Sequence, residues 1–356
     1  MKSEKKKVLV AMSGGVDSSV AAYLLQQEGY ETAGVTMHVG DFDKDGKSRQ
    51  RRFHSKIVKH ARKLCKHLGL KHYVLDLSKE MEEYVINNFI LEYINGRTPN
   101  PCVCCNKYLK FGKLLDYAKR IGFDCLATGH YARIEKRKNR YFLCRPKDAV
   151  KDQTYFLYCI KKTDLPRIIF PLAEYTKSQV RNIAEKSRIP FSLKPASQDI
   201  CFVPDGDYKQ FILRRTAPSP AGNIVNKQGV ILGRHSGMVN YTIGQRSRLG
   251  ISGGRPQYVI ALDKKNNEVI VGERDDLKAS VLHVRNFNRL VDYFPKNVFA
   301  KIRYGHKEAA CRVSVQQNRT VKVTFSCPQE AVTPGQSIVF YNRQTMLGGG
   351  IIKKAR

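Results

Sequence analysis

Near the N-terminus, the apolar run Val8–Met12 leads directly into a turn made of glycine, serine and aspartate. The turn reads Ser13-Gly-Gly-Val-Asp-Ser-Ser19, and the amphipathic stretch Val20–Gln27 follows it without a break. This order predicts a strand, a sharp turn and a helix, with a backbone that can approach a ligand closely at the glycines. The serine hydroxyls and the N–H groups of the first helical turn would then converge where an anion is bound.

The same loop excludes one common phosphate-binding motif. It contains no lysine and lacks the G-x-x-x-x-G-K spacing of a Walker A loop. It resembles instead the PP-loop of enzymes that split ATP between its α and β phosphates, activate an oxygen as an adenylate and release pyrophosphate. The alternative is an ordinary strand-to-helix turn with a Ser or Asp cap. We favour the PP-loop because the glycines, the serines and Asp17 all fall at one strand end.

Length and composition limit the class of protein. The 356 residues are enough for two or three domains with a substantial core. No apolar run approaches the ~18 residues that span a bilayer, so we expect a soluble protein without membrane contact. The basic start Met1–Lys7 is not followed by the apolar segment of a secretory signal, which favours the cytoplasm. The ten cysteines are scattered, which in an intracellular enzyme indicates thiol chemistry rather than a disulfide framework.

The charge is strongly basic, with 63 Lys and Arg against 31 Asp and Glu, a formal net charge of +32. An excess this large goes beyond what solubility requires and favours a polyanionic partner, most commonly nucleic acid. Basic residues occur in nearly every segment, so solvated helix faces also account for part of the charge. The charge indicates nucleic acid only together with other signals.

The first 204 residues alternate between strand and helix patterns, which predicts an α/β domain with a parallel sheet and ligands at the strand C-termini. The predicted strands are Lys6–Met12, Glu31–Val39, His72–Leu77 and Cys125–Thr128. The predicted helices are Lys56–Leu68, Lys79–Tyr93, Asn106–Ile121 and Thr176–Ser187, with a hairpin over Tyr131–Arg145.

Beyond about Pro204 the helix pattern fades after Asp207–Arg214, and short β-rich runs separated by Gly, Asn and Pro take over. This spacing predicts a small β-rich central domain followed by a C-terminal β-barrel. We expect domains at 1–204, 205–275 and 276–356. The predicted strands are Tyr258–Leu262, Glu268–Val271, Val298–Ile302, Thr320–Phe325 and Ser337–Tyr341.

Two cysteine segments carry the candidate chemistry. In Gly96–Lys107, two prolines stiffen the loop and Asn106 can cap the next helix, which would place Cys105 at a helix N-terminus and favour its thiolate. In Ser197–Phe202, a short strand-like run carries Cys201. Zinc is a rival for Cys102, Cys105 and Cys201, but no second ligand pair completes a structural site. The remaining cysteines expected as inert core residues are Cys65, Cys125, Cys144, Cys159, Cys311 and Cys327.

With these segments the chain resembles the tRNA-specific 2-thiouridylases, a family of PP-loop ATP pyrophosphatases with an adenine-nucleotide alpha-hydrolase-like sheet. The resemblance covers nearly the whole chain. Its motifs are Ala11–Ser19, Gly96–Asn106, Ala127–Tyr131, Lys151–Leu157, Ser197–Phe202, Gly233–His235, Tyr241–Arg246, Ile302–Tyr304, Ala331–Gln336 and Leu347–Gly350.

The resemblance implies that the enzyme is a sulfurtransferase that adenylates C2 of a wobble uridine and then transfers sulfur to it. Cys201 would carry a persulfide, and Cys105 would be the nucleophile that frees the sulfur or closes a Cys105–Cys201 disulfide. The implied ATP-binding residues are Ala11, Met12, Ser13, Gly14, Gly15, Val16, Asp17, Ser18, Met37 and Gly129. The implied target-base residues are Asn100, Pro101 and Cys102. The implied tRNA contacts are His130, Lys151, Asp152, Gln153, Arg303, Tyr304 and Gln336, with the C-terminal barrel contacting tRNA.

The implied cofactors and partners are ATP with Mg²⁺, tRNAs for Lys, Glu and Gln, and a cysteine desulfurase or sulfur-relay protein. This chain departs from the family in two places. Position 102 is Cys where many members have Asp, and Asp41–Arg52 is unusually basic, which we attribute only to tRNA attraction. Three thiols could also hold a four-iron, four-sulfur cluster through Cys102, Cys105 and Cys201. We favour the persulfide route, which needs only two of them.

Two other classes of function remain open on the sequence. A PP-loop amidotransferase or synthetase would also adenylate an oxygen, but it needs an ammonia source, and the chain shows no N-terminal Cys nucleophile or fused glutaminase. A non-catalytic tRNA-binding protein would explain the charge but would leave the PP-loop and both cysteine segments without a role.

Overall fold

The computed structural model of the chain describes residues 5–40, 49–190, 200–203, 206–251, 255–315 and 320–355, with only the backbone of residues 49–56. The first half forms a five-stranded parallel sheet in the order β3-β2-β1-β4-β7. Its strands are β1 (Lys7–Ala11), β2 (Glu31–His38), β3 (Lys71–Asp76), β4 (Cys125–Thr128) and β7 (Ile168–Ile169). The predicted parallel sheet is confirmed, and β7 adds a short edge strand that the sequence pattern did not reveal.

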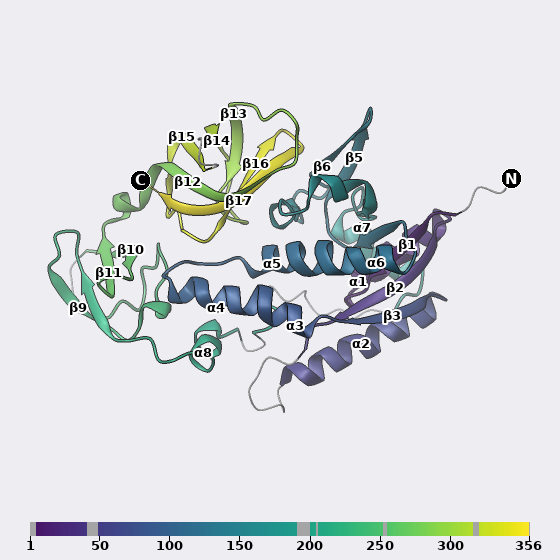
Figure 1. The fold of residues 1–356 in the computed structure, drawn as a ribbon, viewed down its shortest axis with the longest axis horizontal. Coiled ribbons are helices and arrows are strands. Elements are labelled where there is room, and N and C mark those ends of the chain that lie inside the picture. The colour runs from purple at the N-terminus through teal and green to yellow at the C-terminus, as the bar shows by residue number, and fades with distance from the viewer. Residues whose placement is uncertain are drawn as a thin grey trace.

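Helices cover both faces of this sheet (Figure 1). One face carries α1 (Val16–Gln27), α2 (Arg49–His67) and α7 (Lys177–Lys186), and the other carries α5 (Pro101–Cys104), η2 (Cys105–Leu114) and α6 (Leu115–Arg120). Val8 and Val10 of β1 are buried against the first layer, whereas Leu9 is buried against the second. After its first residue Lys7, the strand is therefore apolar, because both of its faces are covered.

One predicted helix begins earlier than expected. The segment predicted to start at Asn106 is helical from Pro101 onward, and proline is favoured at a first helical position because its missing N–H would be unpaired there anyway. Asn106 lies inside the helix, is buried, and donates its side-chain amide to the Phe156 carbonyl at 3.0 Å. The prediction that Asn106 caps this helix is therefore wrong, and Cys105 is not at the helix N-terminus.

The helix predicted over Lys79–Tyr93 is confirmed as one continuous helical run. It consists of α3 (Ser78–Glu80), η1 (Met81–Ile86) and α4 (Asn87–Ile94). Short 3₁₀ segments connect other elements: η3 (Thr154–Phe156), η4 (Lys162–Arg167), η5 (Met238–Asn240) and η6 (Arg274–Leu277). Along the part of the chain described here, no helix is both long enough and apolar enough to cross a membrane.

The C-terminal segment forms a closed barrel, as predicted. Six strands run in the order β12-β15-β14-β13-β16-β17, and β12 pairs again with β17 to close the ring. They are β12 (Lys278–Arg289), β13 (Asn297–Lys301), β14 (Ala309–Val315), β15 (Val321–Glu330), β16 (Ser337–Asn342) and β17 (Thr345–Ala355). The predicted hairpin, β5 (Arg133–Arg137) and β6 (Arg140–Cys144), extends this sheet from β17. The N-terminal domain thus contributes the two strands β5 and β6 to the C-terminal sheet.

The central domain is a four-stranded sheet in the order β10-β11-β8-β9. Its strands are β8 (Gly222–Val225), β9 (Ile231–His235), β10 (Tyr258–Asp263) and β11 (Glu268–Gly272), and the helix α8 (Tyr208–Leu213) precedes them. The boundaries expected at 204 and 275 stay predictions.

Two cysteine predictions change in the structure. Cys201 and Phe202 lie in a turn closed by a hydrogen bond from Val203 N to Ile200 O at 2.8 Å, so the strand predicted there is wrong. Cys327, predicted as a core residue, is exposed because the inward alternation of β15 ends at Phe325. The five other cysteines expected in the core are buried. Residues 41–48 of the basic stretch and Ser197–Asp199 lie outside the described residues.

Candidate active site

The glycine turn forms a cradle between β1 and α1. Gly14 has a φ of +79°, a left-handed conformation that favours glycine, and Gly15 is the N-cap of α1. The Ser18 and Ser19 hydroxyls both donate to the Gly15 carbonyl at 3.0 Å, which fixes the turn. At the end of the neighbouring β4, a Cβ on Gly129 would lie 2.8 Å from the Ser18 nitrogen, so only glycine allows this approach. The N–H groups of the first turn of α1 are thus presented at the strand ends, as an anion site requires.

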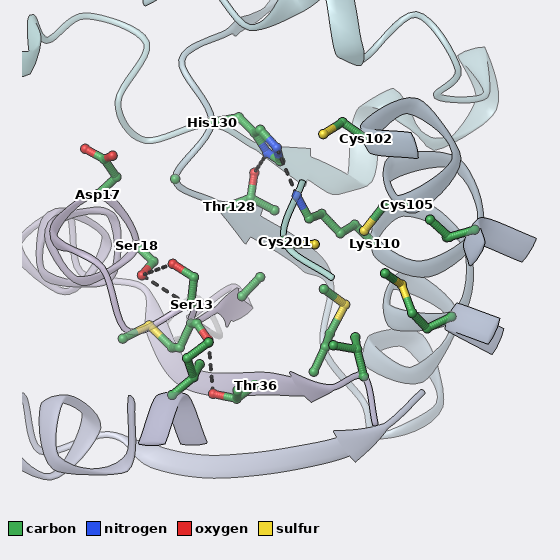
Figure 2. A pocket seen from close by; sticks show the side chains of 18 of the residues that line it. Ser13, Asp17, Ser18, Thr36, Cys102, Cys105, Lys110, Thr128, His130 and Cys201 are labelled. Atoms are coloured by element: carbon green, nitrogen blue, oxygen red, sulfur yellow. Dashed lines mark hydrogen bonds between the residues drawn. The ribbon is translucent and has the colours of Figure 1, made fainter. Parts of the chain in front are cut away.

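A pocket of about 440 Å³, which we call the main pocket, opens beside this cradle (Figure 2). Seven of the predicted ATP-binding residues line it: Ala11, Met12, Ser13, Asp17, Ser18, Met37 and Gly129. Gly14, Gly15 and Val16 shape the turn but do not line the pocket. Of the predicted base-contacting and tRNA-contacting residues, Pro101, Cys102, His130 and Gln153 line it. The cradle, apolar strand-end side chains and these polar groups therefore share one cavity.

Three thiols line the same pocket although they come from two distant segments. Cys102 and Cys105 come from the α5–η2 helix and Cys201 from its turn (Figure 2). Phe202 holds that turn in place, because its buried ring packs edge-on against Phe89 at 5.3 Å between centroids. The structure thus brings together the two cysteine segments that the sequence separates by about a hundred positions.

Burial favours the protonated form of all three thiols. Cys102 and Cys201 are open to the pocket, but protein surrounds them on most sides, so burial raises the pKa of both, that of Cys201 to about 12. Burial also raises the pKa of Cys105, against the opposing effect of the Lys110 ammonium. The prediction that a helix N-terminus makes Cys105 a thiolate is therefore wrong for this arrangement. Lys110 is the cation that lowers the pKa of all three thiols.

Lys110 also contacts His130. Its Nζ lies 3.3 Å from His130 Nε2, and His130 Nδ1 lies 2.7 Å from Thr128 Oγ1. An ammonium can only donate, so Nε2 accepts and the Nδ1–H donates to Thr128. Burial and the Lys110 charge hold the pKa of His130 well below its ordinary value, so the ring is neutral. Lys110 was not predicted as a site residue. It lies beside the thiols of the main pocket because of the geometry of the α5–η2 helix, and no sequence motif indicates this.

The opposite side of the same helix lines a second cavity of about 820 Å³ toward the barrel. Asn100, Cys104 and Lys107 line it, and Cys104 donates its thiol to Asn88 Oδ1 at 3.5 Å. Burial raises the pKa of Cys104 to about 11, and Lys107 opposes that rise. Asn100 therefore lies on the other side of the helix start from Cys102, although both are predicted base contacts.

The Asp17 carboxylate is already paired. Lys177 Nζ lies 2.6 Å from both of its oxygens, and the Tyr131 hydroxyl donates to Oδ1 at 2.8 Å. In Figure 2 this carboxylate lies apart from the Ser13 and Ser18 hydroxyls. Asp17 therefore has no free pair of oxygens for a Mg²⁺ ion in this arrangement. Neither Lys177 nor Tyr131 was predicted, because both come from segments outside the loop motif.

The predicted tRNA residues divide into exposed and internal ones. Lys151 is exposed, and Tyr304 is 42% exposed beside the Phe156 ring at 4.6 Å. Asp152 is buried, and its Oδ1 accepts from the Thr154 hydroxyl at 2.6 Å, so its side chain is occupied within the protein.

Arg303 and Gln336 bind the backbone of two turns. Arg303 donates to the Glu330 and Ala331 carbonyls at 3.0 and 3.3 Å. Gln336 donates its amide to the Thr98 and Pro99 carbonyls at 3.0 and 3.3 Å. A turn of the barrel is thus fastened to the segment that leads into Asn100-Pro-Cys102.

A metal ion needs several His, Cys, Asp or Glu side chains grouped around one point. Within the described ranges, no three His, Cys, Asp or Glu side chains are grouped closely enough to hold a metal ion. A cluster or a zinc ion held by Cys102, Cys105 and Cys201 does not fit this arrangement of the described residues.

The comparisons with known proteins agree on one family. Three domain families match in succession: the tRNA methyl transferase HUP domain over residues 6–205, the tRNA methyl transferase PRC-barrel domain over 209–273, and the aminomethyltransferase beta-barrel domain over 280–352. A tRNA-specific 2-thiouridylase MnmA 1 of Syntrophus aciditrophicus is 49% identical over 351 residues, 99% of this chain and 94% of that protein. The MnmA proteins of Clostridium botulinum and Caldicellulosiruptor saccharolyticus are each 46% identical, with 99% of both chains covered. The chain therefore belongs to the tRNA-specific 2-thiouridylase family.

Proposed function

We propose that this protein is a tRNA uridine 2-sulfurtransferase that uses ATP to replace the C2 oxygen of a wobble uridine by sulfur. The observation that carries the proposal is that an anion cradle and the Cys105 and Cys201 thiols line a single pocket. An adenylating loop and a sulfur carrier must reach the same carbon, and this pocket provides for both. The relatives are named for the same reaction.

In the first step, the uridine C2 oxygen attacks the α-phosphorus of ATP, and N3 of the base gives up its proton to solvent or to a general base. The bond between the α-phosphorus and the bridging oxygen breaks, and pyrophosphate leaves. The cradle at Gly14 and Gly15 holds the phosphates by N–H groups, and Mg²⁺ would enter with the triphosphate. C2 is then an electrophile with AMP as its leaving group.

In the second step, sulfur reaches C2 from a persulfide on Cys201. The Cys105 thiolate attacks the Sγ of that persulfide, forms the Cys105–Cys201 disulfide and releases hydrosulfide, which displaces AMP from C2. The transferred sulfur is reduced by two electrons and the two thiols are oxidised by two, so the step balances. A thiol reductant must then reopen the disulfide, and a cysteine desulfurase or relay protein must restore the persulfide.

The raised thiol pKa values require an activating group for this step. Lys110 stabilises the thiolate form of both cysteines and is thereby suited to activate Cys105 as the nucleophile. Neutral His130, held by Thr128 and Lys110, keeps that ammonium in place. We also propose that the protein acts in the cytoplasm on tRNAs for Lys, Glu and Gln. The target base would lie against Asn100, Pro101 and Cys102.

Mass spectrometry of nucleosides tests the reaction. Unmodified tRNA incubated with the protein, ATP and a persulfide donor should yield 2-thiouridine and AMP in equal amounts. A methylated nucleoside, an aminated base or unchanged tRNA would reject the proposal.

Cys102→Ala distinguishes the persulfide route from a cluster route. Since the persulfide route needs only Cys105 and Cys201, this variant should keep most of its single-turnover activity. Loss of activity together with iron bound by the wild-type protein would overturn the route.

A further inference from the structure

The loop that cradles the phosphates contains no cation of its own, and one is supplied from elsewhere in the fold. The loop Ser13–Ser19 has no lysine or arginine. Lys177, the first residue of α7, places its ammonium 2.6 Å from both oxygens of Asp17, inside the first turn of α1. We propose that Lys177 binds the β and γ phosphates of ATP and that Asp17 positions it. The inference rests on the proposed function only in taking ATP as the ligand.

The geometry of α7 fixes where this lysine can reach. Thr176 caps the helix in a capping box with Gln179, and the Lys177 backbone N–H donates to Asp148 Oδ2 at 2.8 Å. The helix packs beside α1, so its first turn faces the phosphate loop. The Lys177 side chain is 20% exposed, which leaves it reachable from solvent but constrained in direction.

Electrostatics explains why the pair exists. A carboxylate in the first turn of α1 repels a polyanion at the same helix end, so Asp17 alone would weaken phosphate binding. The buried Tyr131 ring supports the pair, with its hydroxyl on Asp17 and its face 6.0 Å from the Lys177 ammonium. An ammonium has three donors, and the two Asp17 oxygens leave at least one for a phosphate. Lys177 can therefore bridge Asp17 and the triphosphate.

Two roles for Lys177 must be separated: binding phosphate, and merely neutralising Asp17. Calorimetry with the α,β-methylene analogue of ATP, without tRNA, measures binding apart from turnover. Lys177→Met should weaken the analogue about ten- to one-hundred-fold, the size expected for a charged hydrogen bond to phosphate. It should leave AMP affinity unchanged, because AMP lacks the β and γ phosphates. Lys177→Arg should retain most of the affinity.

The double variant Asp17→Asn, Lys177→Met decides between the roles. If Lys177 binds phosphate, the double variant recovers only the affinity that repulsion by the unpaired Asp17 removed, and it still binds the analogue more weakly than the wild type does. If it only neutralises Asp17, removing both charges restores wild-type affinity, and the proposal fails. Lys186→Met, in the last turn of the same helix, is the matched control and should bind like the wild type. Thermal unfolding of each variant shows whether it is folded.

The analogue-binding experiment and the 2-thiouridine assay can fail independently of each other. An enzyme that makes no 2-thiouridine but loses analogue affinity in Lys177→Met would reject the sulfur-transfer reaction and keep this inference. Equal analogue affinity in wild type and Lys177→Met would reject the inference alone.

Discussion

Lys110 and Lys107 occupy one helix but act on different thiols. Lys110 stabilises the thiolates of Cys105 and Cys201 in the main pocket, and Lys107 stabilises that of Cys104 in the second cavity. Removing a cation raises the pKa of the thiols beside it, because the charged form loses its partner.

Alkylation of individual cysteines, mapped by mass spectrometry between pH 7 and 10, checks this pairing. Because the pKa of Cys201 is raised to about 12, its alkylation should still rise about tenfold per pH unit at pH 10. Lys110→Met should slow Cys105 and Cys201 and spare Cys104, and Lys107→Met should do the reverse. Equal effects of both variants on Cys201 would contradict the assignment.

Gln336 was expected to contact tRNA by family resemblance, yet its amide binds the Thr98 and Pro99 carbonyls. A residue that positions the base-contacting segment should affect turnover more than tRNA affinity. Gln336→Ala is therefore expected to lower the single-turnover rate about fivefold, with tRNA affinity nearly unchanged. Gln329→Ala, whose amide binds only the nearby Cys327 carbonyl, is the matched control. A loss confined to tRNA affinity would support the direct contact instead.

At the scale of secondary-structure elements, the position of the turn that carries Cys201 depends on the packing of the neighbouring Phe202 ring. That ring is 1% exposed and packs against Phe89 and Phe211 at 5.3 and 5.5 Å. Phe202→Ala should lower the free energy of unfolding by about 3–5 kcal/mol if the cluster unfolds with the whole domain.

The variant should also separate the two halves of the reaction. Nucleotide binding at the cradle should survive at a temperature where the protein is folded, while sulfur transfer from Cys201 falls. Chemical denaturation and single-turnover assays measure the two effects, and unchanged sulfur transfer would show that the turn holds Cys201 without this anchor.

The sequence predicted the elements that carry strong local patterns and missed those set by distant contacts. The strand-turn-helix at Val8–Gln27 was predicted because its apolar run and glycines act locally. The helix start at Pro101 was missed because Asn106 is a favourable N-cap residue by type, whereas in the structure its side-chain amide donates to the Phe156 carbonyl from inside the helix. Cys201 was assigned to a strand because the apolar neighbours that bury Phe202 come from other parts of the chain.

Lys110 could not be placed by an ordinary helical wheel. Lys110 is five positions after Cys105, and two residues with that spacing lie on different faces of an α-helix. The segment η2 is a π-helix, whose hydrogen bonds join residues five apart, so the two lie one above the other. The local helix type therefore decides which cation reaches the thiols.

At the scale of the whole molecule, the strong positive charge makes a testable prediction about tRNA binding. The net charge of +32 predicts tRNA binding through several Lys and Arg contacts, with log affinity falling linearly with log salt. The slope should be roughly 0.7–0.9 per phosphate neutralised. Filter binding between 50 and 200 mM salt, on the order of the range where such contacts are lost, measures it. A flat dependence would mean that the charge is only solvated surface.

The β5–β6 hairpin and the Gln336 turn join the barrel to the N-terminal domain, so the barrel is fixed relative to the segment that leads into the main pocket. The sequence pattern predicted the hairpin but could not predict that it pairs with β17 of the barrel sheet.

We propose that the phosphate cradle and the thiols act as one site, and a labelled single turnover measures whether they do. Protein carrying a sulfur-34 persulfide on Cys201 is mixed with unmodified tRNA, with and without ATP, and nucleosides and peptides are analysed by mass spectrometry. We expect sulfur-34 in 2-thiouridine only with ATP, together with a Cys105–Cys201 disulfide. Label transfer without ATP, or equal transfer by Cys201→Ser after the same loading, would show that the cradle and the Cys201 thiol do not act as one site.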